Sequence, residues 1–140
     1  MRQTITWKTN DKFPNVEIGD NIVMKAKSLD DIPEHILKNC FKDGKLKIND
    51  DSLCKYILHG KLNFEDQHEK YSIERYKLWS YNGISYFDPF YIKKFLLKSS
   101  QVYVNGDNKA ALIINKNYIC VVASCLPEEG AIFTPDEPEP

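Results

Sequence analysis

The stretch from Tyr71 to Cys125 carries the strongest local signals of the chain: YSIERYKLWSYNGISYFDPFYIKKFLLKSSQVYVNGDNKAALIINKNYICVVASC. Its first part is dense in aromatic and β-branched residues, which favour a strand half covered by a core. Asn82-Gly83 tolerates positive φ and suits a two-residue hairpin turn. We therefore expect residues 84–87 to form the return strand of a hairpin.

A helix is predicted to begin at Asp88-Pro89 and to run to about Lys98. Asp is a good N-cap, and Pro at the first helical position loses no hydrogen bond, because its missing N–H would be unpaired there. The apolar stripe at helical spacing consists of Tyr91, Ile92, Phe95 and Leu96. On the other side lie Lys93, Lys94 and Lys98. The expected helix therefore has one apolar and one basic face.

Three short strands are predicted after this helix, at residues 101–105, 110–114 and 118–125. The cluster from Asn105 to Asn108 is typical of a turn, and Pro127 ends the last strand because it cannot donate to a ladder. This half of the chain is therefore read as a β-α-β-β-β unit with an extra hairpin strand in front.

The first half is predicted to contain strands at residues 2–8, 16–18, 22–27 and 45–48, and a helix capped by Asp30 or Asp31 with Pro33 in its first turn. Leu53 to Leu58 fits a strand or a helix, and we favour a strand. Residues 61–70 are polar without a clear period, which predicts a mobile connecting loop. The two helix starts are separated by about 56 residues, so the order of elements allows a duplicated β-α-β-β-β unit.

Composition indicates one ordinary globular domain. The chain has 140 residues, of which 42% are hydrophobic and 28% are charged, and this suffices for a core without disulfides. We expect a single α+β domain over residues 1–127, with two helices packed on antiparallel sheet. Residues 128–140 are acidic and rich in proline, which predicts a loose tail that is dispensable for folding, with local docking of Ile132 and Phe133 as an alternative.

The net charge of −1 gives no general attraction to nucleic acid, so such a role would need a local basic face. The sequence has no run of about 18 apolar residues and no apolar signal core, and we expect a cytoplasmic protein. The four cysteines are then reduced thiols.

Residues able to carry catalysis or bind metal are present but do not form known patterns. The cysteines and histidines lack paired C-x-x-C spacing, so we expect buried thiols and no metal. No nucleophile motif surrounds any serine or cysteine. Asp50-Asp51 and Glu65-Asp66 are read as solvated turn residues, and no Gly-rich phosphate loop is present. We therefore expect no catalytic residue and no cofactor.

The segment from Phe87 to Leu97, FDPFYIKKFLL, resembles the helix opening of bacterial β-type sliding clamps. The strands that follow it, up to Pro127, resemble the closing strands of a clamp domain, which is a double β-α-β-β-β unit. Clamp subunits contain two or three such domains, whereas this chain has room for one, so it would need six copies to form a ring, or would form no ring at all. In clamp-like folds, helices such as this one line the channel and touch phosphates without reading bases.

These observations lead to two functional expectations. The first is a non-enzymatic binding protein, a clamp-like DNA-associated accessory factor of a virus or mobile element, in which Lys93, Lys94 and Lys98 contact DNA. The alternative for these lysines is a solvated helix face. The second expectation is a small inhibitor of a host defence protein, of anti-CRISPR or anti-restriction type, or of a replication protein, whose acidic loops and tail mimic nucleic acid. The expected partners are another protein, from the host or a further copy of this chain in a homo-oligomer, and DNA bound through its backbone.

Overall fold

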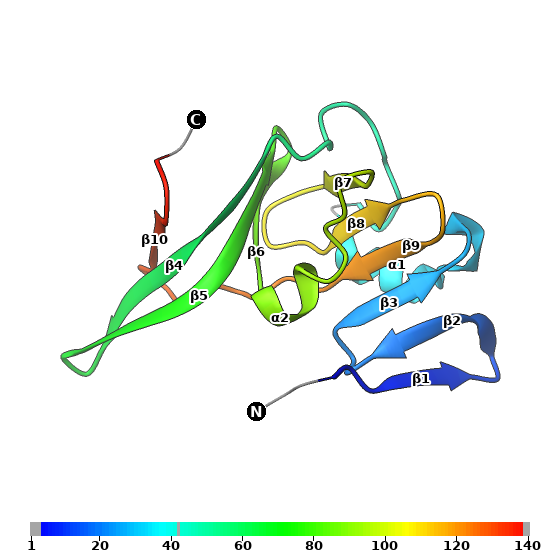
Figure 1. Ribbon diagram of the computed structural model, residues 1–140, viewed down its shortest axis with the longest axis horizontal. Coiled ribbons are helices and arrows are strands. Elements are labelled where there is room, and N and C mark those ends of the chain that lie inside the picture. Colours follow the sequence, from blue (N-terminus) through cyan, green and yellow to red (C-terminus); the bar gives the residue numbers. More distant parts are fainter. Residues whose placement is uncertain (1–3, 42, 139–140) are drawn as a thin grey trace.

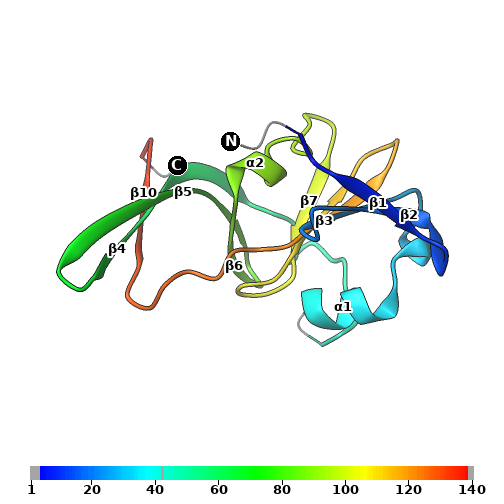
Figure 2. The same ribbon diagram turned by 90° about the horizontal axis from the view of Figure 1, so that it is seen from below.

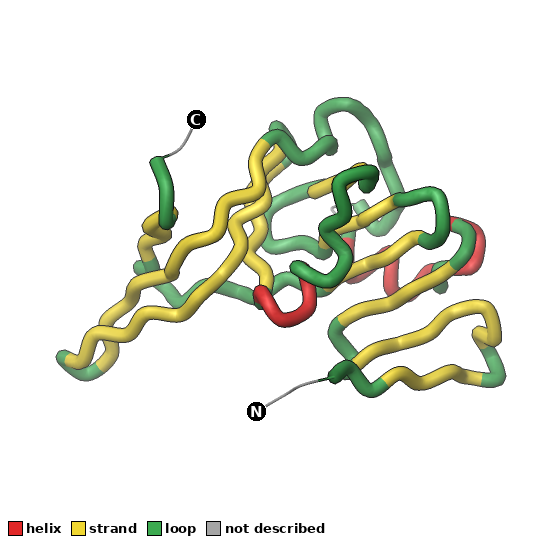
Figure 3. Tube along the Cα trace, viewed as in Figure 1, coloured by secondary structure: helices red, strands yellow, loops and turns green. Residues whose placement is uncertain are grey.

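The computed structural model describes residues 4–41 and 43–138 of the chain. Within these ranges the chain forms ten strands and two α-helices, and the strands are arranged in two antiparallel sheets (Figure 1). The fold is therefore mixed α+β, as predicted, but strands dominate it, as the tube view makes plain (Figure 3). A duplicated β-α-β-β-β unit is not confirmed, since three strands precede the first helix.

The larger sheet has six strands and joins the two ends of the sequence. In spatial order its strands are β1 (Trp7–Asn10), β2 (Phe13–Gly19), β3 (Val23–Ala26), β9 (Ile119–Val122), β8 (Ala111–Ile114) and β7 (Gln101–Val104). The central contact is the pairing of β3 with β9, which places Val23 opposite Val122. The strands β3, β7, β8 and β9 fall where the sequence predicts them. The first predicted strand, at residues 2–8, overlaps β1 only at its end, and residues 2 and 3 lie outside the described part of the chain. β2 begins at Phe13, earlier than the predicted strand at residues 16–18.

The smaller sheet has four strands, in the spatial order β10 (Ile132–Pro135), β4 (Tyr56–Asp66), β5 (Glu69–Ser80) and β6 (Gly83–Phe87). The β5–β6 hairpin is confirmed, but its two-residue turn is Tyr81-Asn82 and not the predicted Asn82-Gly83, because Ser80 pairs with Gly83. Gly83 lies so close to the backbone of Gly106 and Asp107 that a Cβ would have no room. The hairpin turn is therefore held against the loop that follows β7.

The two faces of the six-stranded sheet bury separate cores. On β8, Leu112 faces the helix α1 (Glu34–Cys40), whereas Ala111 and Ile113 face the other way, as the alternation of a strand requires. That second face is covered by residues of β5, β6 and the helix α2 (Pro89–Ile92). Figure 2 shows α1 and α2 on opposite sides of this sheet.

Helix α2 is much shorter than predicted. Its start is confirmed, since the Asp88 carboxylate accepts a hydrogen bond from the Phe90 N–H at 2.9 Å. After Ile92 the helical hydrogen bonds change from four residues back to three residues back, since the Phe95 N–H bonds to the Ile92 carbonyl at 3.1 Å. This tighter turn lets Phe95 pack edge-on against Trp7 within the core. Tertiary packing therefore overrides the helical pattern, and the predicted helix to Lys98 is wrong.

Two predictions for the middle of the chain are also wrong. Residues 61–70 are not a mobile loop but the far end of the β4–β5 hairpin. Its turn consists of Gln67 and His68, both with positive φ (50° and 70°), and it lacks the Gly or Asn that usually marks such a turn. The predicted strand at residues 45–48 is absent. At residues 53–58 the choice of a strand over a helix is confirmed, although the strand begins only at Tyr56.

The loose-tail prediction is wrong for the segment that forms β10. Residues 132–135 pair with β4, and the Phe133 ring lies 5.7 Å from that of Tyr86 on the far strand of the sheet. Phe133 and Tyr86 lie on the two edge strands of this sheet, which in a flat sheet would be much farther apart. The sheet must therefore curl, with the Phe133 ring on its concave side. Beyond the strand, the Asp136 N–H bonds to the His59 carbonyl at 2.9 Å, and its carboxylate contacts the His59 ring. The acidic, proline-rich composition of this segment therefore gave no indication of the short strand β10.

Buried serine hydroxyls join the two sheets. Ser80 donates to the Val104 carbonyl at 2.6 Å, and Ser85 donates to the Gly106 carbonyl at 3.2 Å. Both side chains are buried, so each needs such a partner. The loop after β7 is therefore fixed to the β5–β6 hairpin by hydrogen bonds as well as by packing. Among the described residues, no helix is long and apolar enough to cross a membrane.

Candidate functional site

The lysines predicted to form a basic face are all exposed. Lys93 is the C-cap residue of α2, and Lys94 and Lys98 lie in the turns that follow it. The Lys94 ammonium lies 4.8 Å from the centre of the Phe90 ring. The three lysines therefore cluster at the end of a short helix instead of lying along the face of a long one. Their contact with DNA stays a prediction.

The most prominent feature that the sequence did not predict is the β4–β5 hairpin, called the arm below. It projects from the body of the molecule well beyond the end of β6 (Figure 1). Two stacked cross-strand pairs stiffen it: Phe64 with Tyr71 near the tip, at 5.5 Å between ring centres, and Tyr56 with Trp79 near the base, at 5.4 Å. Such pairs stabilise a hairpin beyond its backbone bonds. The arm is therefore a hairpin that its own cross-strand aromatic pairs stabilise.

One side of the arm ends in an unpaired strand edge. β5 pairs with β4 from Glu69 to Trp79, but β6 covers only Tyr76 to Ser80 on the other side. Among the described residues, no strand pairs with that side of residues 69–75. We call these residues the open edge. Unpaired edges are templates for a further strand, and natural proteins usually block or cover them.

Apolar side chains accompany the open edge. Tyr71 and Ile73 are 41% and 38% exposed, which is high for such residues in a strand. Where β6 ends and α2 begins, a concavity of about 490 Å³ adjoins the edge, lined by residues 72–75 and 88–90. The edge therefore offers backbone groups, apolar contacts and a recess in one place.

The cysteines lie apart from this edge. Cys120 is buried in the core of the six-stranded sheet, and Cys40, Cys54 and Cys125 are half-buried free thiols. Burial raises the pKa of the Cys40, Cys54 and Cys120 thiols, which disfavours the reactive thiolate. Among the residues that the structure describes, no group of three His, Cys, Asp or Glu side chains is placed to hold a metal ion.

Comparison of the sequence with protein-family models and curated proteins, and of the structure with solved structures, finds no match.

Proposed function

We propose that this chain is a non-enzymatic binding protein that captures an extended segment of another protein by adding it as a strand to the open edge of β5. The single observation that supports the proposal is the unpaired edge at residues 69–75, on an arm that projects from the body. Strand addition draws affinity from main-chain hydrogen bonds and specificity from pockets for alternate side chains.

The register of β5 indicates which backbone N–H and C=O groups of the open edge are available to an added strand. A two-residue hairpin turn makes Ser80 and Gly83 a hydrogen-bonded pair, so the backbone N–H and C=O of Ser80 face β6. These groups alternate sides along a strand, so those of every second residue face the same way. On the open edge these are Lys70, Ser72 and Glu74, each with one donor and one acceptor.

The side chains near the edge favour a partner segment with apolar residues at alternate positions. One face of the added strand would lie beside Tyr71 and Ile73, which are exposed in the free protein. The end nearest α2 would reach the recess beside Pro89 and Phe90, which suits one further apolar side chain. We therefore expect an extended apolar–polar segment as the ligand of this edge.

A proline at Ser72 tests the proposal, because it removes an outward N–H without removing a bond to β4. Proline is tolerated at edge positions whose N–H faces solvent. The matched control is Ser72→Ala, since both changes lose the Ser72 hydroxyl, which donates to Asn63 Oδ1 at 2.7 Å. Peptides selected from a displayed random library against the native protein should bind Ser72→Ala as well as the native protein. They should bind Ser72→Pro at least about tenfold more weakly, a loss of one or two hydrogen bonds.

Two results would overturn the proposal. One is a set of selected peptides whose affinity is the same for Ser72→Pro and Ser72→Ala. The other is a native protein that is dimeric in sedimentation analysis, becomes monomeric with Ser72→Pro and yields no binding peptide from the library, since the edge would then be reserved for a second copy. Protection of the Ser72 amide from hydrogen exchange on peptide binding would support the proposal directly.

A second candidate is the clamp-like DNA-associated factor, in which a single domain assembles into a ring. It is supported by the exposure of Lys93, Lys94 and Lys98, all three of which are available to phosphates. Three lysines give only weak, salt-sensitive binding unless a symmetric oligomer multiplies them. This candidate therefore requires both assembly and DNA binding, whereas strand capture requires neither.

A further inference from the structure

The open edge carries a sequence that complements itself when two copies run in opposite directions. Residues 69–75 read EKYSIER. On either side of the central Ser72, residues at equal distance carry opposite charges, and the two residues next to it are apolar. Two antiparallel copies of this segment, related by a two-fold axis at Ser72, would therefore set unlike charges and apolar residues opposite each other along their whole length.

The backbone of β5 permits this alignment. The N–H and C=O groups of Lys70, Ser72 and Glu74 face the open edge, as the register of β5 against β6 requires. With Ser72 on the two-fold axis, the outward groups of one copy meet the outward groups of the other. Three residue pairs then exchange two main-chain hydrogen bonds each. The edges of two copies can therefore pair as a regular antiparallel ladder.

On one face of the arm, the pairing would extend a row of apolar side chains. Tyr71 is stacked on Phe64 of β4, and Ile73 lies opposite the buried Leu62. In the paired arms, Tyr71 of each copy lies beside Ile73 of the other. One row across four strands would then be apolar throughout, and it would cover side chains that a single copy leaves exposed.

On the other face, the pairing would extend a row of charges. Within the arm Lys70 lies opposite Glu65, and Glu74 lies opposite Lys61. When Lys70 of each copy meets Glu74 of the other, the charges alternate in sign across four strands. A shift by two residues, the smallest that keeps the outward groups opposite each other, would set Lys70 or Glu74 opposite Ser72 instead. Charge complementarity therefore selects the register with Ser72 on the axis.

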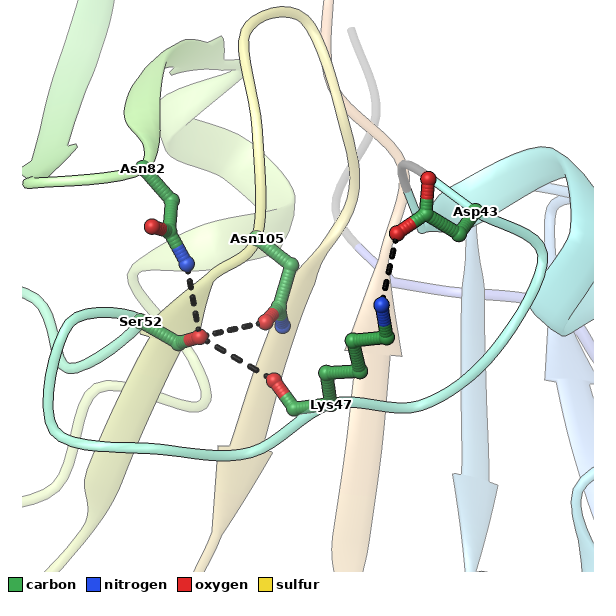
Figure 4. Close-up of polar contacts among 5 residues, drawn as sticks. All are labelled: Asp43, Lys47, Ser52, Asn82 and Asn105. Atoms are coloured by element: carbon green, nitrogen blue, oxygen red, sulfur yellow. Dashed lines mark hydrogen bonds and ion pairs between the residues drawn. The ribbon is translucent and has the colours of Figure 1, made fainter.

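The arm has the length and the support that this contact needs. In the selected register the ladder ends where β6 begins to cover β5, and the tip of the second copy reaches the recess lined by residues 72–75 and 88–90. The sheet is fixed to the body at the β5–β6 turn, since Asn82 Nδ2 donates to the buried Ser52 hydroxyl at 3.0 Å (Figure 4). An edge that is held in place before binding loses little entropy on binding.

We infer that two copies of this chain pair through their open edges, and that this dimer masks the capture site until a target segment displaces the second copy. The inference rests on the proposed function and adds its regulation. The ladder involves residues 69–75 of each copy, far fewer than the 20 to 30 or so on each side of a standard interface. The dimer is therefore weak and exchanges readily, which masking requires.

The test reverses the charges of Lys70 and Glu74 in separate proteins. Lys70→Glu and Glu74→Lys each set like charges opposite one another twice in a homodimer, whereas an equal mixture of the two variants restores two unlike pairs. Sedimentation analysis at about 0.5 mM chain should show dimers for the native protein and for the mixture. Each variant alone should dimerise about tenfold or more weakly than the native protein. An arm that had only lost its structure would not be rescued by mixing.

Lys116→Glu is the charge-matched control, since Lys116 is exposed in a turn outside the arm, and this variant should dimerise like the native protein. A monomeric native protein, or a mixture that stays monomeric, would overturn the dimer. Strand capture would still stand if selected peptides distinguish Ser72→Pro from Ser72→Ala. A peptide that dissociates the dimer would support masking, and a peptide that binds and leaves the dimer intact would overturn it.

Discussion

Gly60 on β4 provides a direct test of how β10 is held. A Cβ built at Gly60 would lie 2.6 Å from Phe133 Cζ and 2.8 Å from Pro135 Cα, and it would also collide with the Thr134 carbonyl oxygen. Two of these three atoms belong to the backbone of β10, so a rotamer change cannot relieve the clash. Gly60→Ala should therefore displace β10 from the sheet while leaving the β4–β5 ladder intact.

The expected loss of stability can be estimated from the contacts that β10 makes in the sheet. The half-buried Phe133 ring contributes about 2 kcal/mol through burial, and its packing against Tyr86 adds about 1 kcal/mol. The ladder bonds of the strand are largely offset by the entropy of ordering it. We therefore expect Gly60→Ala to lower the free energy of unfolding by up to about 3 kcal/mol, and the Tm by up to about 10 °C.

A double-mutant cycle provides the control. A chain that ends at Ala131 lacks β10 altogether, so it should lose a similar amount of stability, and Gly60→Ala should then have almost no further effect. Thermal melting followed by circular dichroism measures all four proteins. Additive losses, or a Gly60→Ala protein as stable as the native one, would refute the argument that β10 is docked on Gly60.

Four further predictions follow from the fold and its candidate sites. The triple change of Lys93, Lys94 and Lys98 to Glu should leave the Tm unchanged; retention of DNA on filters at low salt should be lost if the clamp-like candidate is correct, and a monomer without DNA affinity would exclude it. Leu112→Ala, at a fully buried position, should cost about 2–5 kcal/mol in urea unfolding, whereas Leu126→Ala, at a 76% exposed position, should stay within about 0.5 kcal/mol. Because burial raises the pKa of the Cys120 thiol, the folded state keeps its proton while the unfolded state loses it above about pH 8.5, so stability should be full below that pH and fall as pH rises, less steeply in Cys120→Ala. A chelator or a reductant should leave the Tm unchanged, and a large drop with either would reveal a metal or a disulfide.

The sequence predicted those parts of the fold in which local pattern and tertiary environment agree. The strands β7 to β9 and the β5–β6 hairpin were found because apolar runs alternate with strong turn residues. The arm was missed because its turn, Gln67-His68, lacks the Asn-Gly or Asp-Gly pair that usually signals a hairpin. Helix α2 was drawn too long because the burial of Phe95 depends on a distant partner, Trp7, that no local pattern reveals.

The candidate sites were harder to predict than the fold. The open edge is defined by where β6 ends relative to β5, and pairing of this kind depends on tertiary structure. The self-complementary order of residues 69–75 is present in the sequence, but only the structure shows that these residues lie on the open edge. The lysines near α2 could be found from composition, because charge is visible in a sequence whereas an unpaired strand edge is not.

The pairing of β3 with β9 has a consequence for how the chain folds as it is synthesised. Val23 is synthesised long before its partner Val122, because the strands β4 to β8 lie between the two in the sequence. Bringing two strands so far apart in sequence together costs conformational entropy before their contacts can stabilise the pair. This cost slows folding in sheet proteins with many long-range pairings. Part of the apolar surface of the β1–β2–β3 meander therefore stays uncovered until β9 has been made. During that interval it should be the segment most exposed to chaperones and to aggregation.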